Sequence, residues 1–168
     1  MLPPELPDLP SSLHALLAKQ WARLSDVLAS ASDQQLTESV AQELTTVSIG
    51  SDYLVDQLVK YPQMLASLLE SGVLECSYQQ SEYKNRLAEA MVSIDSEASM
   101  MSVLRQFRQR EMVRLIWRDL TRKASMIDTT RELSWLADAM IDGTLNLLYE
   151  QGCERWGIPY GVSPESGK

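Results

Sequence analysis

The residues best suited to binding chemistry are six arginines near the middle of the chain, which we call the arginine stripe. They are Arg105, Arg108, Arg110, Arg114, Arg118 and Arg122. The last four stand four residues apart, which in an α-helix places them along one slowly drifting face. A guanidinium group holds a phosphate or a carboxylate through two parallel hydrogen bonds. The spacing therefore predicts either a docking surface or a row of ion pairs.

Three interpretations of the arginine stripe are open. The arginine stems can pack on apolar surface while their heads meet acids of neighbouring helices. The stripe can instead face an anionic ligand or another domain, or it can contact DNA. The chain has a net charge of −8, although residues 105–123 hold seven basic and only two acidic side chains. This acid excess supplies ion-pair partners and argues against nucleic acid and anionic membranes as partners.

Other reactive residue types are sparse. His14 is the single histidine, which removes most catalytic triads and histidine-based zinc sites. The two cysteines, Cys76 and Cys153, are far apart and signal neither a disulfide framework nor a metal knuckle. Asp138 and Asp142 could share a metal on one helical face, but a solvated face is the simpler interpretation. We predict no catalytic, cofactor-binding or metal-ligating residue in this chain.

The tail at 161–168 is superficially similar to a phosphate-binding loop. Its glycine and lysine spacing is wrong by one residue, and no strand precedes it. The tail therefore gives no support to a nucleotide site.

Composition predicts an all-α fold. The chain of 168 residues has 25 leucines and 13 alanines against 10 valines and 6 isoleucines, a balance that favours helix over strand. No proline occurs between 63 and 158, and a sheet protein would need more turn residues there. We expect a helical bundle of about six or seven helices, the last two long and antiparallel.

Apolar periodicity and capping residues place these helices. The shorter ones are expected at 11–28, 32–50, 51–61, 62–71 and 81–92. Residues 1–10 are expected to be a flexible Pro-rich arm, 11–158 a single helical domain, and 159–168 a linker. Ser32 with Gln35 forms a capping-box pattern for the second helix.

Two long helices complete the expected fold, at 96–122 and 129–151. The first is apolar on all sides, which is typical of a central, buried helix. Thr129 with Glu132 suggests a capping box at the start of the second. Because the loop between them is short, they should pack antiparallel. Trp117, Trp135 and Trp156 are interpreted as packing residues.

The chain shows no signal for a membrane or for export. No stretch reaches the roughly 20 apolar residues of a membrane span, and the N-terminus lacks the pattern of a signal peptide. The residues alone thus predict a cytoplasmic, acidic, all-α domain without a catalytic constellation.

A longer motif adds a family resemblance. Residues 104–120 read LRQFRQREMVRLIWRDL, which resembles the LR-x-FR-x-RE-M-x-R-x-x-W-RDL segment of bacterial glutamine synthetase adenylyltransferases. The similarity continues at 132–138, 148–149 and 156–159, and upstream at 51–53 and 61–65.

That family is a two-part enzyme of nitrogen regulation. The resemblance implies that one half removes AMP from a tyrosine of glutamine synthetase by phosphorolysis, while the other attaches AMP from ATP. Both halves are nucleotidyltransferases that use Mg²⁺ held by paired aspartates. A PII-type signal protein and glutamine set the balance, so glutamine synthetase, the PII-type protein and the remainder of the parent enzyme are the implied partners.

This chain departs from the family at its catalytic motif. A glycine-rich GMGKLGG turn and an SSDIDL strand would follow a segment like 152–168, and no position here matches them. The resemblance therefore implies the N-terminal helical subdomain of the adenylyl-removing half, inactive alone and without its own cofactor. The alternative is a free-standing helical module that binds a partner protein through the arginine-rich helix.

Overall fold

The computed structural model describes residues 9–30, 36–92, 94 and 96–159 of the chain. Within these ranges all regular secondary structure is α-helical and no strand occurs, which confirms the all-α prediction. The eight helices are α1 (Ser11–Arg23), α2 (Ser25–Ser30), α3 (Glu38–Gly50), α4 (Asp52–Lys60), α5 (Gln63–Glu70), α6 (Gln80–Met91), α7 (Glu97–Leu120) and α8 (Met126–Trp156). The expected arm and linker lie almost wholly outside the described residues.

The described residues form one helix more than the seven ranges predicted, because the helix predicted over 11–28 divides at Leu24. The backbone N–H of Leu24 still bonds to the carbonyl oxygens of Gln20 and Trp21, and α2 resumes at the next residue. Leu24 is fully buried, so the break keeps its side chain in the core. A local turn of this kind leaves the apolar periodicity almost unchanged.

Side-chain caps fix several helix starts. The hydroxyls of Ser51 and Ser96 accept hydrogen bonds from backbone N–H groups in the first turns of α4 and α7. Thr37 caps α3 in the same way, so that helix begins at Glu38. The capping box expected from Ser32 and Gln35 lies outside the described residues.

The start of α8 corrects a prediction. The helix begins at Met126, where Ser125 caps it by accepting from the backbone N–H of Asp128. The proposed capping box of Thr129 and Glu132 is wrong, because both residues lie inside the helix. Glu132 is instead buried against α7. Sequence spacing alone could not separate a capping glutamate from a buried one.

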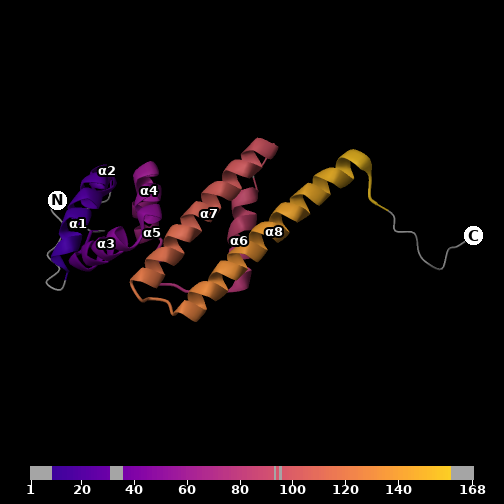
Figure 1. Ribbon diagram of the computed structural model, residues 1–168. Helices are drawn as coiled ribbons and strands as arrows, with labels where there is room; N and C mark the ends of the chain where they lie inside the picture. The colour runs from indigo at the N-terminus through magenta and orange to yellow at the C-terminus, as the bar shows by residue number, and fades with distance from the viewer. Residues whose placement is uncertain (1–8, 31–35, 93, 95, 160–168) are drawn as a thin grey trace, which may run out of the picture.

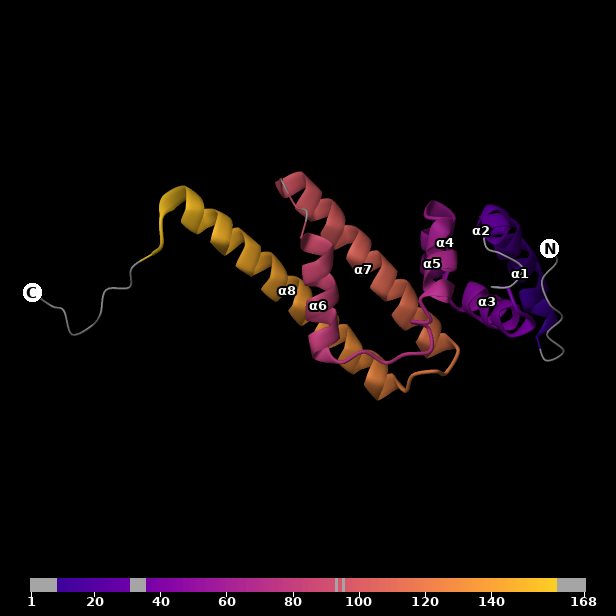
Figure 2. The ribbon, with the colours of Figure 1, turned by 180° about the vertical axis from the view of Figure 1, so that it is seen from behind.

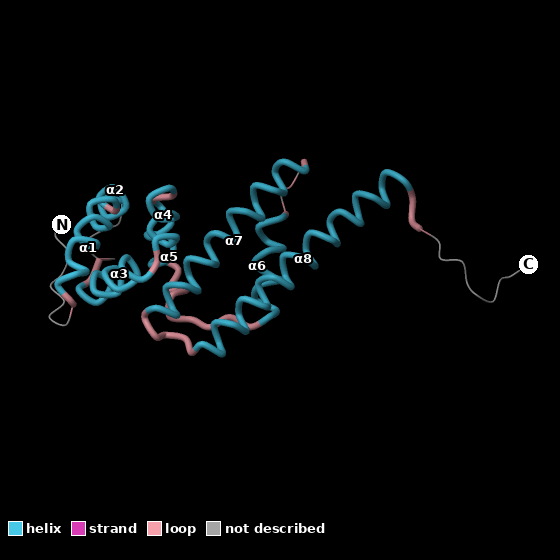
Figure 3. The backbone as a smooth tube through the Cα atoms, viewed as in Figure 1, coloured by secondary structure: helices cyan, strands magenta, loops and turns pink. Residues whose placement is uncertain are grey.

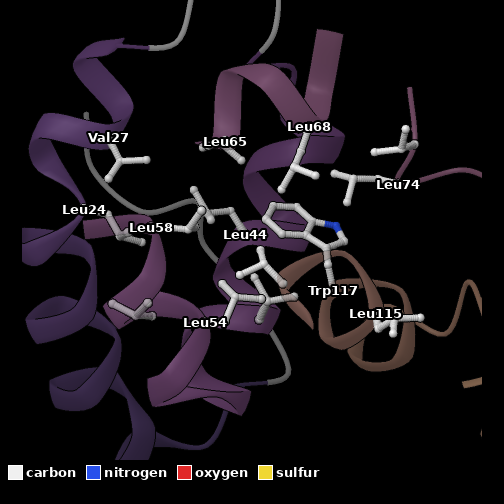
Figure 4. Close-up of a cluster of buried hydrophobic side chains, with 14 of the residues drawn as sticks. Leu24, Val27, Leu44, Leu54, Leu58, Leu65, Leu68, Leu74, Leu115 and Trp117 are labelled. Atoms are coloured by element: carbon white, nitrogen blue, oxygen red, sulfur yellow. The ribbon is translucent and has the colours of Figure 1, made fainter. Parts of the chain in front are cut away.

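The N-terminal part of the molecule has an apolar core, which we call the N-terminal core. Helices α1 to α5 surround it, and the end of α7 inserts Trp117 among their leucines (Figure 4). Its fully buried aliphatic members include Leu24, Val27, Leu44, Val47, Leu54, Val55, Leu58, Leu65 and Leu68. The Trp117 indole N–H donates to the Glu43 carboxylate at 2.7 Å, which joins α7 to α3.

The C-terminal part consists of α6, α7 and α8. Helices α7 and α8 run antiparallel as predicted, and α6 packs against both of them (Figures 1 and 2). A smaller apolar cluster of Leu87, Met100 and Leu104 holds the far end of this region together. The backbone tube shows that the second half of α8 projects beyond its neighbours (Figure 3).

None of the described helices combines the length and the apolar composition that crossing a membrane would need.

Candidate functional site

Arg114 lies at the centre of a buried polar group that joins the three C-terminal helices. Its side chain is fully buried, and its Nε donates to Glu111 Oε2 at 2.8 Å. Its Nη1 donates to the carbonyl oxygen of Cys76 at 2.9 Å. Its Nη2 donates both to the Tyr83 hydroxyl and to Glu132 Oε2. We call Arg114, Glu111, Glu132, Tyr83 and Tyr78 the Arg114 cluster.

Glu132 of α8 is the acceptor on which the cluster converges. Its Oε2 accepts from Arg114, from the Tyr83 hydroxyl at 2.8 Å and from the backbone N–H of Tyr78 at 3.4 Å. The three donors come from α7, from α6 and from the connector that precedes α6. One carboxylate therefore fixes the relative positions of three segments that are far apart in sequence.

Aromatic rings complete the cluster. The Arg114 guanidinium lies over the Tyr78 ring with its Cζ 3.8 Å from the ring centroid, and Arg86 lies 4.3 Å from the same centroid. Tyr78 and Tyr83 meet edge to face at 5.5 Å. Cation–π contacts of this kind strengthen when they are removed from water. Each of the three Arg114 nitrogens thus donates to at least one acceptor within the protein.

Arg118, one turn further along α7, binds two connecting segments of the chain. It donates to the carbonyl oxygen of Leu74 at 3.0 Å, to the Ser77 hydroxyl at 2.8 Å and to the carbonyl oxygen of Lys123 at 3.3 Å. These partners belong to the connectors before α6 and after α7. Among the described residues, the two buried arginines balance the charges of the two buried glutamates, so this part of the interior carries no net charge.

Burial sets the protonation states in the cluster. Removal from water raises the pKa of the Tyr83 hydroxyl, and its hydrogen bond to Glu132 raises it further. Burial alone would lower the pKa of Arg114, but its interactions with Tyr83, Glu111 and Glu132 outweigh this effect and raise that pKa. Tyr83 is therefore a neutral donor and Arg114 a permanent cation at neutral pH.

A small cavity of about 90 Å³ adjoins the cluster. Tyr78, Asp128, Glu132 and Trp135 are among its lining residues. Glu132 Oε1 and the Tyr78 hydroxyl are buried and have no partner within the described part of the protein. A polar cavity of this size has room for a few water molecules, which would satisfy these atoms.

The arginine stripe is divided between the interior and the surface. Arg114 and Arg118 are buried, whereas Arg105, Arg108 and Arg122 are exposed and form no ion pair within the described ranges. Arg110 is half-buried, donates to Glu111 at 3.1 Å and to the Ser71 hydroxyl at 3.3 Å, and lines a pocket of about 360 Å³ between α5 and α7. A docking role for the exposed arginines stays a prediction.

The remaining candidates lie apart from the cluster. His14 is exposed, and its Nε2 bonds to the carbonyl oxygen of Leu9 at 3.2 Å. Asp138 and Asp142 are exposed on α8, where Asp142 pairs with Lys84 at 2.9 Å. The described residues contain no group of three or more histidine, cysteine, aspartate or glutamate side chains that could hold a metal ion. Cys76 and Cys153 are free thiols, and Cys76 is exposed.

Sequence reasoning found Arg114 but missed its partners. Glu111 stands three residues earlier on α7, so helical spacing could have paired the two. Glu132 and Tyr83 lie on other helices, and although Tyr83 falls on the apolar positions of its helix, nothing in the local sequence marks Glu132 as buried. Their burial depends on how α6 and α8 pack against α7.

The site defines the class of protein. It is an all-α domain in which buried arginines and glutamates pair with one another between helices. The chain belongs to the glutamate-ammonia ligase adenylyltransferase family, whose sequence profile matches residues 41–167.

Curated relatives agree with this assignment. Bifunctional glutamine synthetase adenylyltransferase/adenylyl-removing enzymes from Pseudomonas syringae pv. tomato, Nitrosococcus oceani and Hahella chejuensis are 35%, 35% and 30% identical to it. These alignments cover 94%, 91% and 96% of this chain but only 17%, 16% and 16% of the relatives. The chain thus spans about a sixth of the length of the curated relatives that it matches.

Proposed function

We propose that this chain is the N-terminal helical subdomain of the adenylyl-removing half of a bifunctional glutamine synthetase adenylyltransferase. In this role it is a scaffold for the nucleotidyltransferase core that the longer enzyme contains. The observation that carries the proposal is the match of 94% of the chain to 17% of a relative with that name. The rigid packing of three helices around the Arg114 cluster suits a scaffold.

The activity of the whole enzyme is part of the same proposal. The parent would attach AMP from ATP to a tyrosine of glutamine synthetase and remove it by phosphorolysis, in the cytoplasm and under control of a PII-type protein. The relatives' names include both the adenylylating and the adenylyl-removing reactions. Mg²⁺ would be held by aspartates of the core rather than by this chain.

The chain alone would be inactive. Nucleotidyl transfer requires metal ions held by closely placed carboxylates. Glu111 and Glu132, the two buried carboxylates among the described residues, are already paired with Arg114. The most buried guanidinium groups likewise donate to protein acceptors, so they are not available to a phosphate. These contacts support a structural role for the charged residues.

Activity assays on two proteins test the proposal. The full-length enzyme should transfer AMP to glutamine synthetase and release it by phosphorolysis, whereas residues 1–168 alone should do neither. Calorimetry with Mg-ATP should give a dissociation constant no tighter than about millimolar for the chain alone. Micromolar binding, or turnover by the chain alone, would contradict the structural role.

The free-standing interaction module remains the second candidate, because α8 leaves a large apolar face exposed. The mass of the native gene product separates the two candidates. The proposed function expects a product about six times as long as this chain, in proportion to the relatives. A native product of 18.9 kDa would favour the free-standing module instead.

A further inference from the structure

The second half of α8 exposes a continuous apolar face, which we call the α8 stripe. It consists of Ile141, Leu145, Leu148, Tyr149 and Trp156. Ile141, Tyr149 and Trp156 are 65%, 55% and 76% exposed. At 100° per residue these five positions fall on one side of the helix. Trp156, which the sequence had suggested to be a packing residue, thus has most of its surface in water.

The opposite side of the same helix segment is already occupied. A Cβ placed on Gly143 would lie 2.9 Å from Leu87 Cδ2, so α6 approaches the α8 backbone closely at this point. Leu147 packs against the cluster of Leu87, Met100 and Leu104. The segment therefore has apolar side chains on two opposite sides, a pattern that is typical of a helix buried between two layers.

Only one of these layers is formed by the residues that the structure describes. Helices α6 and α7 cover one side of α8, and its second half projects past them (Figure 2). Soluble monomeric proteins rarely leave a contiguous apolar patch of this kind in water, and such patches mark interaction sites. The α8 stripe therefore requires an occupant.

We propose that the α8 stripe packs against the part of the parent polypeptide that lies outside these 168 residues. The inference rests on the proposed function and specifies the surface through which the scaffold meets the core. The relatives are about six times as long as this chain, so a large body of polypeptide is available as the occupant. The contacting surface would be apolar, because the stripe itself offers aliphatic and aromatic side chains.

Covalent linkage favours this occupant over a second copy of the chain. A tethered segment is present at an effective concentration near millimolar, whereas a second molecule must associate from its free concentration. An intramolecular layer thus covers the stripe before dimerisation can compete. Ile158, just beyond α8, is also exposed and extends the apolar surface along the chain.

Hydroxyl-radical footprinting of the full-length enzyme tests the proposal directly. The measurement is made at a concentration at which sedimentation shows a monomer. Tyr149 and Trp156 should be oxidised roughly tenfold more slowly than free side chains of the same type, because burial removes most of their accessible surface. Met126 and Ile127 are internal controls on the same helix, 82% and 70% exposed, and should react as exposed residues.

Two results would overturn the proposal. Oxidation of Tyr149 and Trp156 at the rates of free side chains would show that nothing covers the stripe. Protection that appears only when the enzyme dimerises would assign the surface to a second copy.

A matched pair of double variants adds a test by substitution. Ile141→Gln with Leu145→Gln should restore rapid oxidation of Tyr149 and Trp156 in the full-length monomer. Met126→Gln with Ile127→Gln changes two exposed apolar residues of the same helix and should leave the protection as it is. Equal footprints for the two double variants would contradict a specific interface.

The activity assay separates this inference from the proposed function. A full-length enzyme that transfers and removes AMP but leaves the stripe rapidly oxidised refutes the docking surface alone. A full-length protein without either activity refutes the proposed function, whatever its footprint.

Discussion

The N-terminal core and the Arg114 cluster stabilise two parts of the same molecule by different means. The N-terminal core consists of leucines and valines around Trp117 and gains its stability from apolar area removed from water. The Arg114 cluster buries charged groups that must meet at defined distances. Dispersed apolar contacts tolerate changes of shape, whereas a buried ion pair fails when one partner is lost. The C-terminal region should therefore be the more specific and the more fragile of the two.

The largest effect is expected for Arg114→Met. The substitution leaves Glu111 and Glu132 buried without their cation, which should lower the free energy of unfolding by about 3–5 kcal/mol. Urea denaturation measures the change. Arg23→Met removes an exposed ion pair with Asp56 and should cost no more than about 1 kcal/mol. Equal urea midpoints for the two variants would remove the contrast between the two regions.

A pair of substitutions in each region sharpens the comparison. Leu58→Ala leaves a cavity in the N-terminal core and should cost about 2–5 kcal/mol, whereas Leu58→Met should cost less than about 1.5 kcal/mol. In the Arg114 cluster, Arg114→Lys should cost nearly as much as Arg114→Met, because an ammonium group cannot replace the planar fork. Urea midpoints of all four variants give the result. If Arg114→Lys leaves the urea midpoint unchanged, a positive charge alone is sufficient to stabilise the Arg114 cluster.

A smaller effect that depends on pH is expected for Tyr83→Phe. Loss of the hydrogen bond to Glu132 should cost about 1.5 kcal/mol at neutral pH. Burial raises the pKa of Tyr83, so above about pH 10 the unfolded chain releases a proton that the folded chain retains. This group thus makes stability fall by about 1.4 kcal/mol per pH unit as the pH rises above 10.

Denaturation at several pH values between 9 and 11 measures this slope. Tyr83→Phe should lose stability less steeply with rising pH than the unchanged protein does. Identical slopes would mean that folding does not raise the pKa of Tyr83.

The smallest effects are expected for two glycines of α8. Gly152 has only the Trp156 ring near its Cβ position, so Gly152→Ala should stabilise the end of the helix by up to about 1 kcal/mol. Gly143→Ala should not stabilise the helix, because the added Cβ would lie 2.9 Å from Leu87 Cδ2. Amide hydrogen exchange along α8 measures both changes. Equal stabilisation by the two alanines would show that α6 moves away easily.

The two regions also differ in how well the sequence predicts them. The N-terminal core follows apolar periodicity, and Leu44, Leu54 and Leu58 lie inside as their spacing indicates. The α7 segment was likewise located closely, because its cap, Ser96, acts within one turn. Local signals of this kind are present in the sequence itself.

The Arg114 cluster could be predicted only in part. Composition and spacing identified the arginine stripe and offered the interpretation that its arginines pair with acids of neighbouring helices. The partner Glu132 lies on another helix, and its spacing from Thr129 suggested a helix cap instead. Trp156 shows the same limit, since periodicity identifies an apolar face without identifying what covers it. The burial of Glu132 and the exposure of Trp156 both depend on contacts between segments that are distant in sequence.

The length of α8 separates its buried ion pair from its exposed tip. Glu132 fixes the helix near its start, and Trp156 lies 24 residues further on, about 36 Å away along the axis. Over that distance a tilt of about 5° at the anchor displaces Trp156 by about 3 Å, from the helical rise alone. The ion pair between Glu132 and Arg114 is thus one of the contacts that set the position of Trp156, together with the packing of Gly143 and Leu147 against the neighbouring helices.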